Sequence, residues 1–301
     1  MRKELRGRYE HIDFNDSGTS LSGKKLAEFL RGHEKAIVAL EVLDDKLFDA
    51  VPTLRHVSKY GVGLDTMDLV AMARRGIVLG WTGGVNRRSV AELVLAFAIA
   101  LLHRVPEGQW HLRQASWAQP VGRELRGRTV GIIGCGHVGK EVAILMRALE
   151  CRVLAHDIQE FQDFYETYSV EPAGLEALLR RSDVVSLHVP LDESTRNMLS
   201  AARLGLLPRN AVLINAARGG LVDEEALKRL LRSGHLGGAA FDVFQTEPPD
   251  DPELLALPSF MATPHIGGSS QEAILAMGRA AIQGLTGGQV PGNGWPGPAC
   301  L

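Results

Sequence analysis

Apolar runs and amphipathic stretches alternate along the middle of the chain. Short apolar runs predict six buried strands, at residues 130–133, 152–155, 184–189, 212–215, 238–241 and 260–262. Apolar positions at helical spacing predict helices between them, which include residues 138–149, 175–179 and 224–232. Asp223 is the expected N-cap of the last of these helices, and Gly234 its expected stop. Strands that alternate with helices are typical of α/β proteins, so we expect a Rossmann-type, doubly wound parallel sheet here.

A second, smaller α/β unit is predicted from both ends of the chain. Its expected strands are residues 36–40, 56–57 and 77–79, and residues 269–285 predict one more helix after the large block. We therefore expect a discontinuous, flavodoxin-like domain of residues 1–83 and 269–301. It would flank a continuous domain of residues 84–268, with long helices near 87–103 and 271–285 connecting the two.

Residues 129–139, TVGIIGCGHVG, carry the clearest chemical signal. Gly134, Gly136 and Gly139 stand between a predicted strand and a predicted helix, as in a dinucleotide-binding turn. The helix N-terminus would direct its N–H groups at the phosphates. Asp157 follows the last glycine by 18 positions (157 − 139) and can accept hydrogen bonds from both ribose hydroxyls, whereas a 2′-phosphate would be repelled. The stretch predicts a site for NAD rather than NADP. The alternative is an ordinary strand–helix turn with a surface Asp.

Composition is that of an ordinary globular protein. The chain has 301 residues, of which 45% are hydrophobic and 23% charged, with a formal net charge of −2. This near-neutral charge lacks the positive excess that is typical of nucleic-acid-binding proteins. Cys135, Cys151 and Cys300 are too few for a disulfide framework and lack zinc-site spacing. The first fifteen residues contain no signal-peptide core, and the apolar run 90–102 is too short for a membrane span. We expect a cytoplasmic protein without nucleic-acid or membrane partners.

Three chemically capable side chains follow predicted strands. Arg218 lies in INAARGG, Glu247 in FDVFQTEP and His265 in TPHIGG. Because ligands of open α/β sheets bind beyond the carboxyl ends of the strands, these residues can converge on one crevice. Taken singly, each also has a structural interpretation: a surface arginine, a turn glutamate and a packed loop histidine.

These segments resemble the D-2-hydroxyacid dehydrogenase family, which includes D-3-phosphoglycerate dehydrogenase and the hydroxypyruvate and glyoxylate reductases. The resemblance covers nearly the whole chain. It includes KYGVGLD at 59–65, similar to the family's substrate-carboxylate loop, and NRRSVAE at 86–92, similar to the start of its interdomain helix. It implies that Arg218, Glu247 and His265 are the catalytic residues.

The resemblance also implies which residues contact the ligands. For NAD they are Thr82, Gly134, Gly136, His137, Val138, Gly139, Asp157, Pro190, Thr195, Ala216, Ala217, Arg218, Asp242, His265, Gly267 and Gly268. For the substrate they are Lys59, Tyr60, Val62, Gly63, Arg218 and His265. For Asp242, the alternative is a buried acid at a strand end that caps backbone groups.

The chemistry of these side chains suits reduction of a 2-oxo acid. Hydride addition to C2 develops negative charge on the keto oxygen. His265 would donate a proton to that oxygen, or accept it in the oxidative direction, and Glu247 would stabilise the protonated ring. Arg218 offers a fork of donors to the substrate carboxylate. No metal is required, because Arg218 and His265 supply the polarisation.

The chain departs from the family pattern at its start. Members usually open with a short apolar strand, whereas residues 2–9 here predict the helix that follows it. We expect the first strand of the small domain to be absent, as if a preceding segment were missing. The absence would leave backbone groups and an apolar face uncovered, unless another segment takes the place of the strand.

The leading hypothesis is an NAD-dependent dehydrogenase that interconverts a small D-2-hydroxy acid and its 2-oxo acid. The expected substrate resembles 3-phosphoglycerate, a hydroxy acid, or hydroxypyruvate, an oxo acid. Arg87 and Arg88 favour a substrate with a second anionic group, unless they are simply solvated at a helix start. Two alternatives remain: an NAD-sensing protein of the corepressor type, and a phosphite- or formate-type dehydrogenase. Residues 90–102 are apolar on every helical face, which suggests burial between the two protomers of a homodimer.

Overall fold

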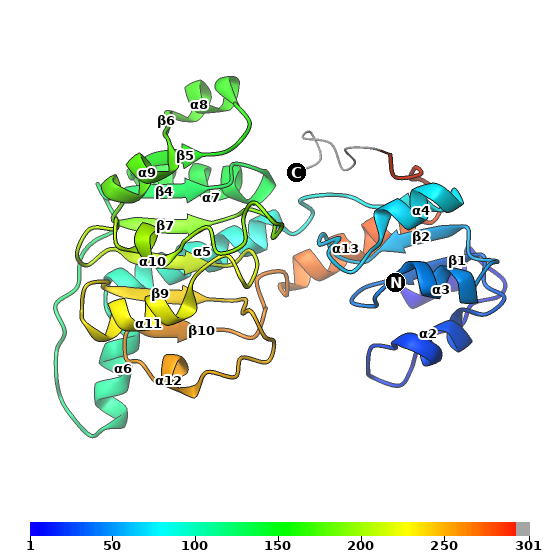
Figure 1. Ribbon diagram of the computed structural model, residues 1–301, viewed down its shortest axis with the longest axis horizontal. Coiled ribbons are helices and arrows are strands. Elements are labelled where there is room, and N and C mark those ends of the chain that lie inside the picture. The colour runs from blue at the N-terminus through cyan, green and yellow to red at the C-terminus, as the bar shows by residue number, and fades with distance from the viewer. Residues whose placement is uncertain (293–301) are drawn as a thin grey trace. The chain divides into compact units, whose positions relative to one another are not determined.

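The computed structural model describes residues 1–292, and residues 293–301, with Cys300, lie outside the described part. The chain divides into two compact units (Figure 1). The smaller unit consists of Met1–Asn86 and Gln271–Leu301, and the larger is the continuous segment Arg87–Ser270.

The larger unit contains a seven-stranded parallel sheet in the order β10-β9-β8-β7-β4-β5-β6. Its strands are β4 (Thr129–Ile133), β5 (Arg152–His156), β6 (Val170–Pro172), β7 (Val184–Leu187), β8 (Val212–Asn215), β9 (Gly238–Phe241) and β10 (Phe260–Ala262). Chain order reverses between β4 and β7, which makes the end of β4 a topological switch point, where α/β sheets bind ligands. The predicted doubly wound α/β fold is confirmed.

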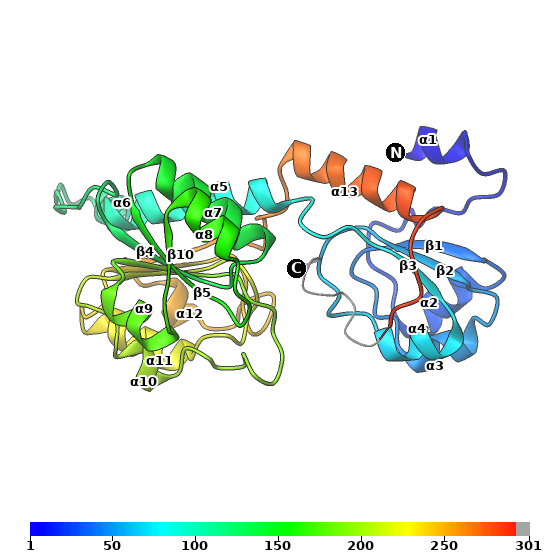
Figure 2. The ribbon, with the colours of Figure 1, turned by 90° about the horizontal axis from the view of Figure 1, so that it is seen from above.

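Helices cover both faces of this sheet (Figure 2). They are α5 (Arg87–Leu102), α6 (Val105–Arg113), α7 (His137–Ala148), α8 (Gln162–Tyr168), α9 (Leu175–Arg181), α10 (Ala201–Leu204), α11 (Glu224–Arg232) and α12 (Pro252–Leu255). On one face α5, α7 and α8 surround a core with Ile132 and Ile214, and on the other α9 to α12 surround a core with Ile133 and Leu213. Adjacent strand residues thus pack into opposite cores, which explains why the strands read as continuous apolar runs.

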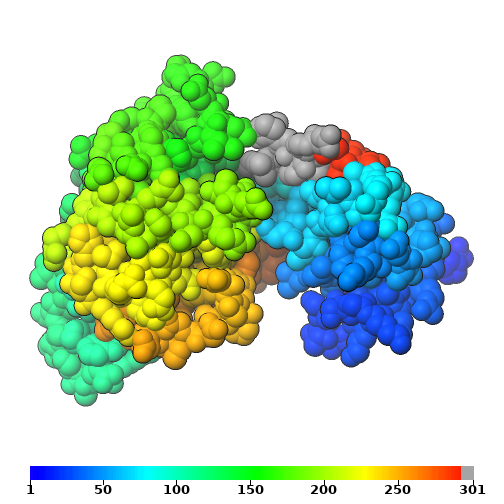
Figure 3. Space-filling model, viewed as in Figure 1, coloured from blue at the N-terminus to red at the C-terminus, as the bar shows by residue number. Residues whose placement is uncertain are grey.

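The α10, α11 and α12 face is the one seen in Figure 3, in the yellow-green to orange segments. Helix α11 begins and ends as predicted. The Asp223 carboxylate accepts a hydrogen bond from the Ala226 N–H (2.9 Å), and Gly234 follows the helix with φ = +67°.

Helix α5 packs inside its own unit, against α7, β8 and β9. Its buried face includes Val94, Phe97 and Leu101, while Glu92 and Ile99 belong to an exposed stripe. Burial within the unit therefore accounts for most of its apolar character, without a second protomer. Within residues 1–292 no single helix has the length and hydropathy of a membrane span. Helices α5 and α6, bent by 63°, meet that test only as a pair.

The smaller unit has a three-stranded parallel sheet in the order β1-β2-β3. The strands are β1 (Lys35–Val38), β2 (His56–Lys59) and β3 (Val78–Gly80). Helices α2 (Gly23–Leu30), α3 (Asp45–Ala50) and α4 (Leu69–Arg75) lie on one face, and α1 (Arg2–Arg6) and α13 (Gln271–Gly284) lie on the other (Figure 2). Within residues 1–292 no strand precedes β1, which is an edge strand.

The segment around α1 supplies apolar cover beside that edge. Leu5 packs with Ile282 and Leu285 of the α13 region, and Phe14 and Ile37 lie against this cluster. Part of the apolar surface that the sequence predicts to be uncovered is therefore shielded by residues before α2.

Candidate active site

The glycine turn after β4 is built by close backbone contacts. Gly134 has φ = +93°, and a Cβ there would lie 2.6 Å from the carbonyl carbon of His188. A Cβ on Gly139 would lie 1.9 Å from the carbonyl oxygen of Gly134, so α7 sits directly on the turn. Gly136 is the N-cap of α7, whose first residue is His137. The helix N-terminus thus opens at the switch point, which fits a pyrophosphate.

Asp157 lies beside this turn, directly after β5. Its Oδ2 accepts a hydrogen bond from the Cys135 N–H (2.6 Å), and its Oδ1 accepts one from the Gln159 N–H (2.9 Å). These bonds hold the carboxylate next to the glycine turn. That is the place where an acid can accept the ribose hydroxyls of a dinucleotide.

His188 provides a further polar group at the same end of the sheet. It follows β7, and its Nε2 lies 2.9 Å from Ser186 Oγ. Its Nδ1 is buried and has no hydrogen-bond partner within residues 1–292. Burial lowers the pKa of His188 to about 3, so the ring is neutral at physiological pH. An orphaned ring nitrogen beside Gly134 fits a bound polar ligand. Sequence reasoning missed His188; its signal in the sequence is a polar residue that closes an apolar strand.

The turn that carries Arg218 is held by Asn215 at the end of β8. The buried Asn215 side chain accepts from the Ala217 N–H (3.2 Å) and donates to the Arg218 carbonyl (2.9 Å). The guanidinium itself donates from Nη1 to the Ala217 carbonyl (2.7 Å). Sequence reasoning missed Asn215, although an Asn that ends a buried strand is a signal for this arrangement.

Glu247 and His265 face one another. Glu247 Oε2 lies 3.0 Å from His265 Nδ1, and the two side chains are 40% and 54% exposed. Glu247 Oε1 accepts a hydrogen bond from the Phe244 N–H (3.1 Å), which anchors the carboxylate to its own loop. With Nδ1 directed at a carboxylate, Nε2 is the ring nitrogen that can exchange a proton with a ligand.

Asp242 organises the backbone around His265. The buried Asp242 carboxylate accepts hydrogen bonds from Thr263 Oγ1 (2.5 Å), the Ile266 N–H (2.7 Å) and the Gly267 N–H (2.8 Å). Its own carbonyl accepts from the His265 N–H (2.9 Å). These contacts are the strand-end cap that was the alternative interpretation of Asp242.

The turns bearing the three candidate catalytic residues lie at one edge of the sheet. They follow β8, β9 and β10, which are consecutive neighbours. A Cβ on Gly219 would lie 1.9 Å from the Phe244 carbonyl oxygen, so the Arg218 turn touches the loop of Glu247. The structure therefore brings the turns of Arg218, Glu247 and His265 together.

The loop after β7 supplies two more predicted cofactor residues. Thr195 Oγ1 donates to the Pro190 carbonyl (2.7 Å) and accepts from the Asp192 N–H (2.8 Å). Thr195 is thus a brace for the loop that contains Pro190. Among the remaining predictions, Val138 lies in α7, Ala216 beside Asn215, and Gly268 in the loop after His265.

The predicted substrate loop belongs to the smaller unit. Lys59 ends β2 and is buried, and its ammonium donates to the Ala39 carbonyl. The Val62 carbonyl accepts a hydrogen bond from Trp81 Nε1 (3.0 Å), which pins the loop of Tyr60, Val62 and Gly63. Thr82 follows Trp81 in the same unit. The sequence does not single out Trp81, because no pattern links it to a loop nineteen residues away.

Arg87 and Arg88 are engaged by carboxylates of the larger unit. Arg87 Nε lies 3.4 Å from Glu141, and Arg88 lies 3.2 Å from Glu141 and 2.6 Å from Glu92. Neither is simply solvated, and their pairing weakens the inference of a second anionic group on the substrate.

Comparison with known proteins agrees with this geometry. Residues 95–267 match the family described as D-isomer specific 2-hydroxyacid dehydrogenase, NAD binding domain. The chain is 36% identical to a glyoxylate reductase of Korarchaeum cryptofilum, over 86% of this chain and 81% of that protein. It is 35% identical to a D-3-phosphoglycerate dehydrogenase of Archaeoglobus fulgidus, over 86% of this chain but only 50% of that longer protein. A crystal structure of an NAD-binding D-isomer specific 2-hydroxyacid dehydrogenase from Polaromonas sp. superposes with a TM-score of 0.87 at 30% identity, covering 95% of this chain and 91% of the other.

Proposed function

Because this chain belongs to the D-isomer specific 2-hydroxyacid dehydrogenase family, we propose that Arg218, Glu247 and His265 catalyse NAD-dependent interconversion of a small D-2-hydroxy acid and its 2-oxo acid. The observation that carries the proposal is the 3.0 Å contact between Glu247 Oε2 and His265 Nδ1, on a loop that touches the Arg218 turn. This is the arrangement of a proton-transfer residue oriented by a carboxylate.

The cofactor would be held by the larger unit. Gly134, Gly136 and Gly139 would admit the pyrophosphate, and the Asp157 carboxylate would accept the adenine ribose hydroxyls. When bound, the nicotinamide supplies or accepts the hydride. We propose that the other cofactor residues named in the family comparison, such as Pro190 and Thr195, also contact NAD.

The protein's own residues would handle charge and protons. Arg218 would bind the substrate carboxylate and stabilise the negative charge that develops on the C2 oxygen. His265 would hold a proton on Nε2 and donate it to that oxygen, while Glu247 compensates the positive charge of the ring. In the oxidative direction the neutral ring would take the proton back. The loop of Lys59, Tyr60, Val62 and Gly63 would contribute backbone N–H donors to the carboxylate.

We favour a small substrate, such as glyoxylate or hydroxypyruvate, over a phosphorylated one. The reason is that Arg87 and Arg88 already pair with Glu141 and Glu92. Relatives named glyoxylate reductase, hydroxypyruvate reductase and D-3-phosphoglycerate dehydrogenase are similarly identical to this chain, so the choice rests on these ion pairs.

Turnover with a panel of 2-oxo acids and NADH tests the function. We expect reduction of glyoxylate or hydroxypyruvate, and losses in kcat of about 10²- to 10⁴-fold for Glu247→Gln and His265→Ala. NADH binding, followed by fluorescence, should be unchanged in both variants, and the exposed His103→Ala should match the wild type. Tight NADH binding without turnover of any 2-oxo acid would contradict an enzyme and favour an NAD-sensing protein.

We also propose a homodimer that resides in the cytoplasm. The larger unit exposes a set of apolar side chains on α6 and the segment after it. They are Val105, Trp110, Leu112, Trp117 and Val121. Contiguous exposed apolar residues commonly mark protein interfaces, and a second copy of the chain offers the same surface in return.

A further inference from the structure

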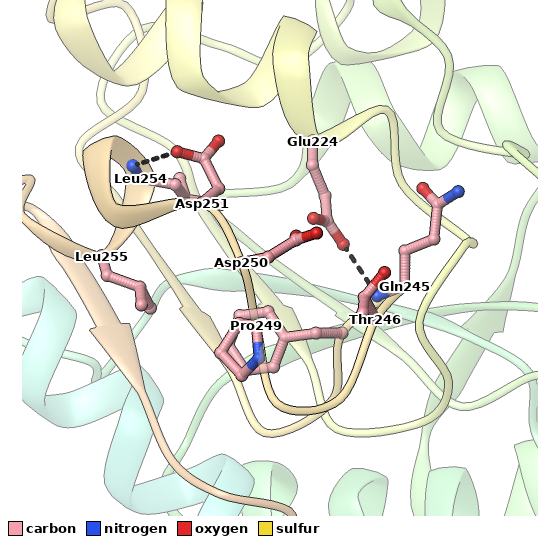
Figure 4. Close-up of a pocket in the computed structure, with 9 residues that line it drawn as sticks. Glu224, Gln245, Thr246, Pro249, Asp250, Asp251, Leu254 and Leu255 are labelled. Carbon is pink, nitrogen blue, oxygen red and sulfur yellow. Dashed lines mark hydrogen bonds between the residues drawn. The ribbon is translucent and has the colours of Figure 1, made fainter.

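Glu224 reaches the loop that carries Glu247. It is the first residue of α11, and its Oε1 accepts a hydrogen bond from the Gln245 N–H (3.3 Å). Figure 4 shows its side chain extending from the start of the helix to this backbone amide. Two residues further along the loop is Glu247, whose Oε2 meets His265 Nδ1.

Two carboxylates thus hold consecutive amides of one turn. The Phe244 N–H is donated to Glu247 Oε1 (3.1 Å), and the Gln245 N–H is donated to Glu224 Oε1 (3.3 Å). The direction of the Glu247 side chain depends on the Phe244 amide. The position of the Phe244 amide depends on the backbone of the next residue, Gln245, which Glu224 holds through its own hydrogen bond.

The loop that carries Gln245 is not fully packed on the side of Glu224. A cavity of about 270 Å³ lies against it, and its lining includes Glu224, Phe244, Gln245, Thr246, Asp250 and Leu254. Asp251 lines the cavity as well, and its carboxylate accepts a hydrogen bond from the Leu254 N–H (3.0 Å) at the start of α12 (Figure 4). The hydrogen bond from Glu224 is therefore a directional restraint on a part of the loop that is not filled in by side chains.

The Gln245 amide favours the ionised form of Glu224 against the effect of its surroundings. Burial raises the pKa of the Glu224 carboxyl, the nearby Asp251, Asp250 and Glu225 carboxylates act in the same direction, and the Gln245 amide opposes them. The neighbouring Lys228 pairs with Glu225 and Asp251 (both 2.7 Å), so its charge is directed away from Glu224.

We propose that Glu224 is a positioning residue, which fixes the Phe244–Gln245 turn and thereby presents Glu247 to His265. This inference rests on the function proposed above only in so far as Glu247 and His265 act in catalysis. The restraint itself can be measured in the protein without substrate or cofactor.

Amide hydrogen exchange tests the restraint directly. In Glu224→Ala the amides of Phe244 and Gln245 should exchange about ten-fold faster, because their turn loses its outer hydrogen bond. Glu224→Gln keeps an acceptor oxygen at the same place and should restore most of the protection. Glu225→Ala is the matched control, since its exposed side chain pairs with Lys228 rather than with an amide of the turn and its loss should leave both amides unchanged.

Kinetics then show whether the restraint serves the reaction. With glyoxylate and NADH, Glu224→Ala should lower kcat about five- to ten-fold and leave the KM for NADH unchanged, and Glu224→Gln should recover most of the rate. Unchanged exchange at Phe244 and Gln245 in Glu224→Ala would overturn the proposal. So would faster exchange spread evenly through α11, because that would mark a loosened helix. Since the exchange measurement needs no turnover, an inactive wild type would refute the proposed function and leave this test intact.

Discussion

The neutral imidazole of His188 couples folding to pH. Its pKa is about 3 in the folded protein, whereas an unperturbed histidine titrates near 6.5. Between these values the unfolded chain binds a proton that the folded chain does not. The contribution of His188 to stability is therefore complete above pH 6.5 and falls as the pH drops towards 3, by up to about 1.4 kcal/mol per pH unit.

Replacing His188 should remove this dependence. We expect His188→Asn to be less sensitive to acid than the wild type, because Asn has no proton to take up on unfolding. Urea unfolding at pH 7.5, 6.0 and 5.0 measures the difference in free energy of unfolding between the two proteins. That difference should shrink by about 1 kcal/mol per pH unit below pH 6. A difference independent of pH would show that the ring is not held neutral.

The charge of Asp157 should set the choice of cofactor. Asp157→Asn keeps an oxygen for the Cys135 N–H but removes the negative charge that would repel a 2′-phosphate. The ratio of kcat/KM for NADH over NADPH should fall about ten-fold or more in this variant. Asp163→Asn, which alters an acid in the first turn of α8, serves as the control. Equal changes for both cofactors would argue against a role in discrimination.

Residues with their own chemistry were easier to predict than those that support them. Gly134, Asp157, Arg218 and His265 belong to short motifs that follow strands, and the spacing of these motifs is visible in one dimension. Trp81 acts through a contact with a loop nineteen residues away, and the sequence carries no record of that pairing. His188 and Asn215 contact residues two or three positions away, but a single polar residue at a strand end does not show which group it will bind.

At the scale of elements, the close contact between α7 and the glycine turn can be tested by adding one methyl group at Gly139. Gly139→Ala would place a Cβ 1.9 Å from the Gly134 carbonyl oxygen, so the helix must shift. We expect NADH affinity to fall at least ten-fold and stability to fall by about 2 kcal/mol or more, measured by fluorescence titration and urea unfolding.

Gly234→Ala is the control for Gly139→Ala. It introduces backbone strain without a steric clash, so it separates the two effects. Gly234 has φ = +67°, but nothing lies within 4 Å of the position that an added methyl group would take. This substitution should cost about 1 kcal/mol of stability and leave NADH affinity unchanged. Similar losses of affinity in both variants would mean that the effect at Gly139 is not local.

Strands made wholly or mostly of apolar residues were predictable, including the edge strand β10, whereas the edge strand β6 was not. The six predicted strands are present because residues on both faces are apolar, although β7 ends at Leu187 rather than at residue 189. Strand β6 was missed because Val170 is its single apolar strand-forming residue, followed by Glu171 and Pro172, so no apolar run marks it. Helix α8 was missed with it, since its seven residues bury Tyr165 alone.

At the scale of the whole molecule, the exposed apolar surface of the larger unit makes the proposed homodimer testable. Trp117 and Val121 are 82% and 87% exposed, and we expect them to be covered in a homodimer. Light scattering should give twice the chain mass for the wild type and a lower average mass for Trp117→Ser. Val70→Ser, in the smaller unit, is the control because Val70 is also exposed. A monomeric wild type would refute the dimer.

The class of fold followed from alternation along the chain, but the substrate does not. The proposed reaction at C2 depends on a few polar residues that follow strands. The side chain attached to C2 would be recognised by loops such as residues 59–65, whose pattern carries no chemical signature beyond its glycines.

The contact between Gly219 and the Phe244 carbonyl limits how this enzyme can diversify. Any side chain at Gly219 would collide with the neighbouring loop, so a substitution there should displace the Arg218 turn and the loop of Glu247 together. Variation that creates new specificities is then confined to segments outside this junction. Libraries for altering substrate preference should leave Gly219 untouched and randomise the loop after β2 instead.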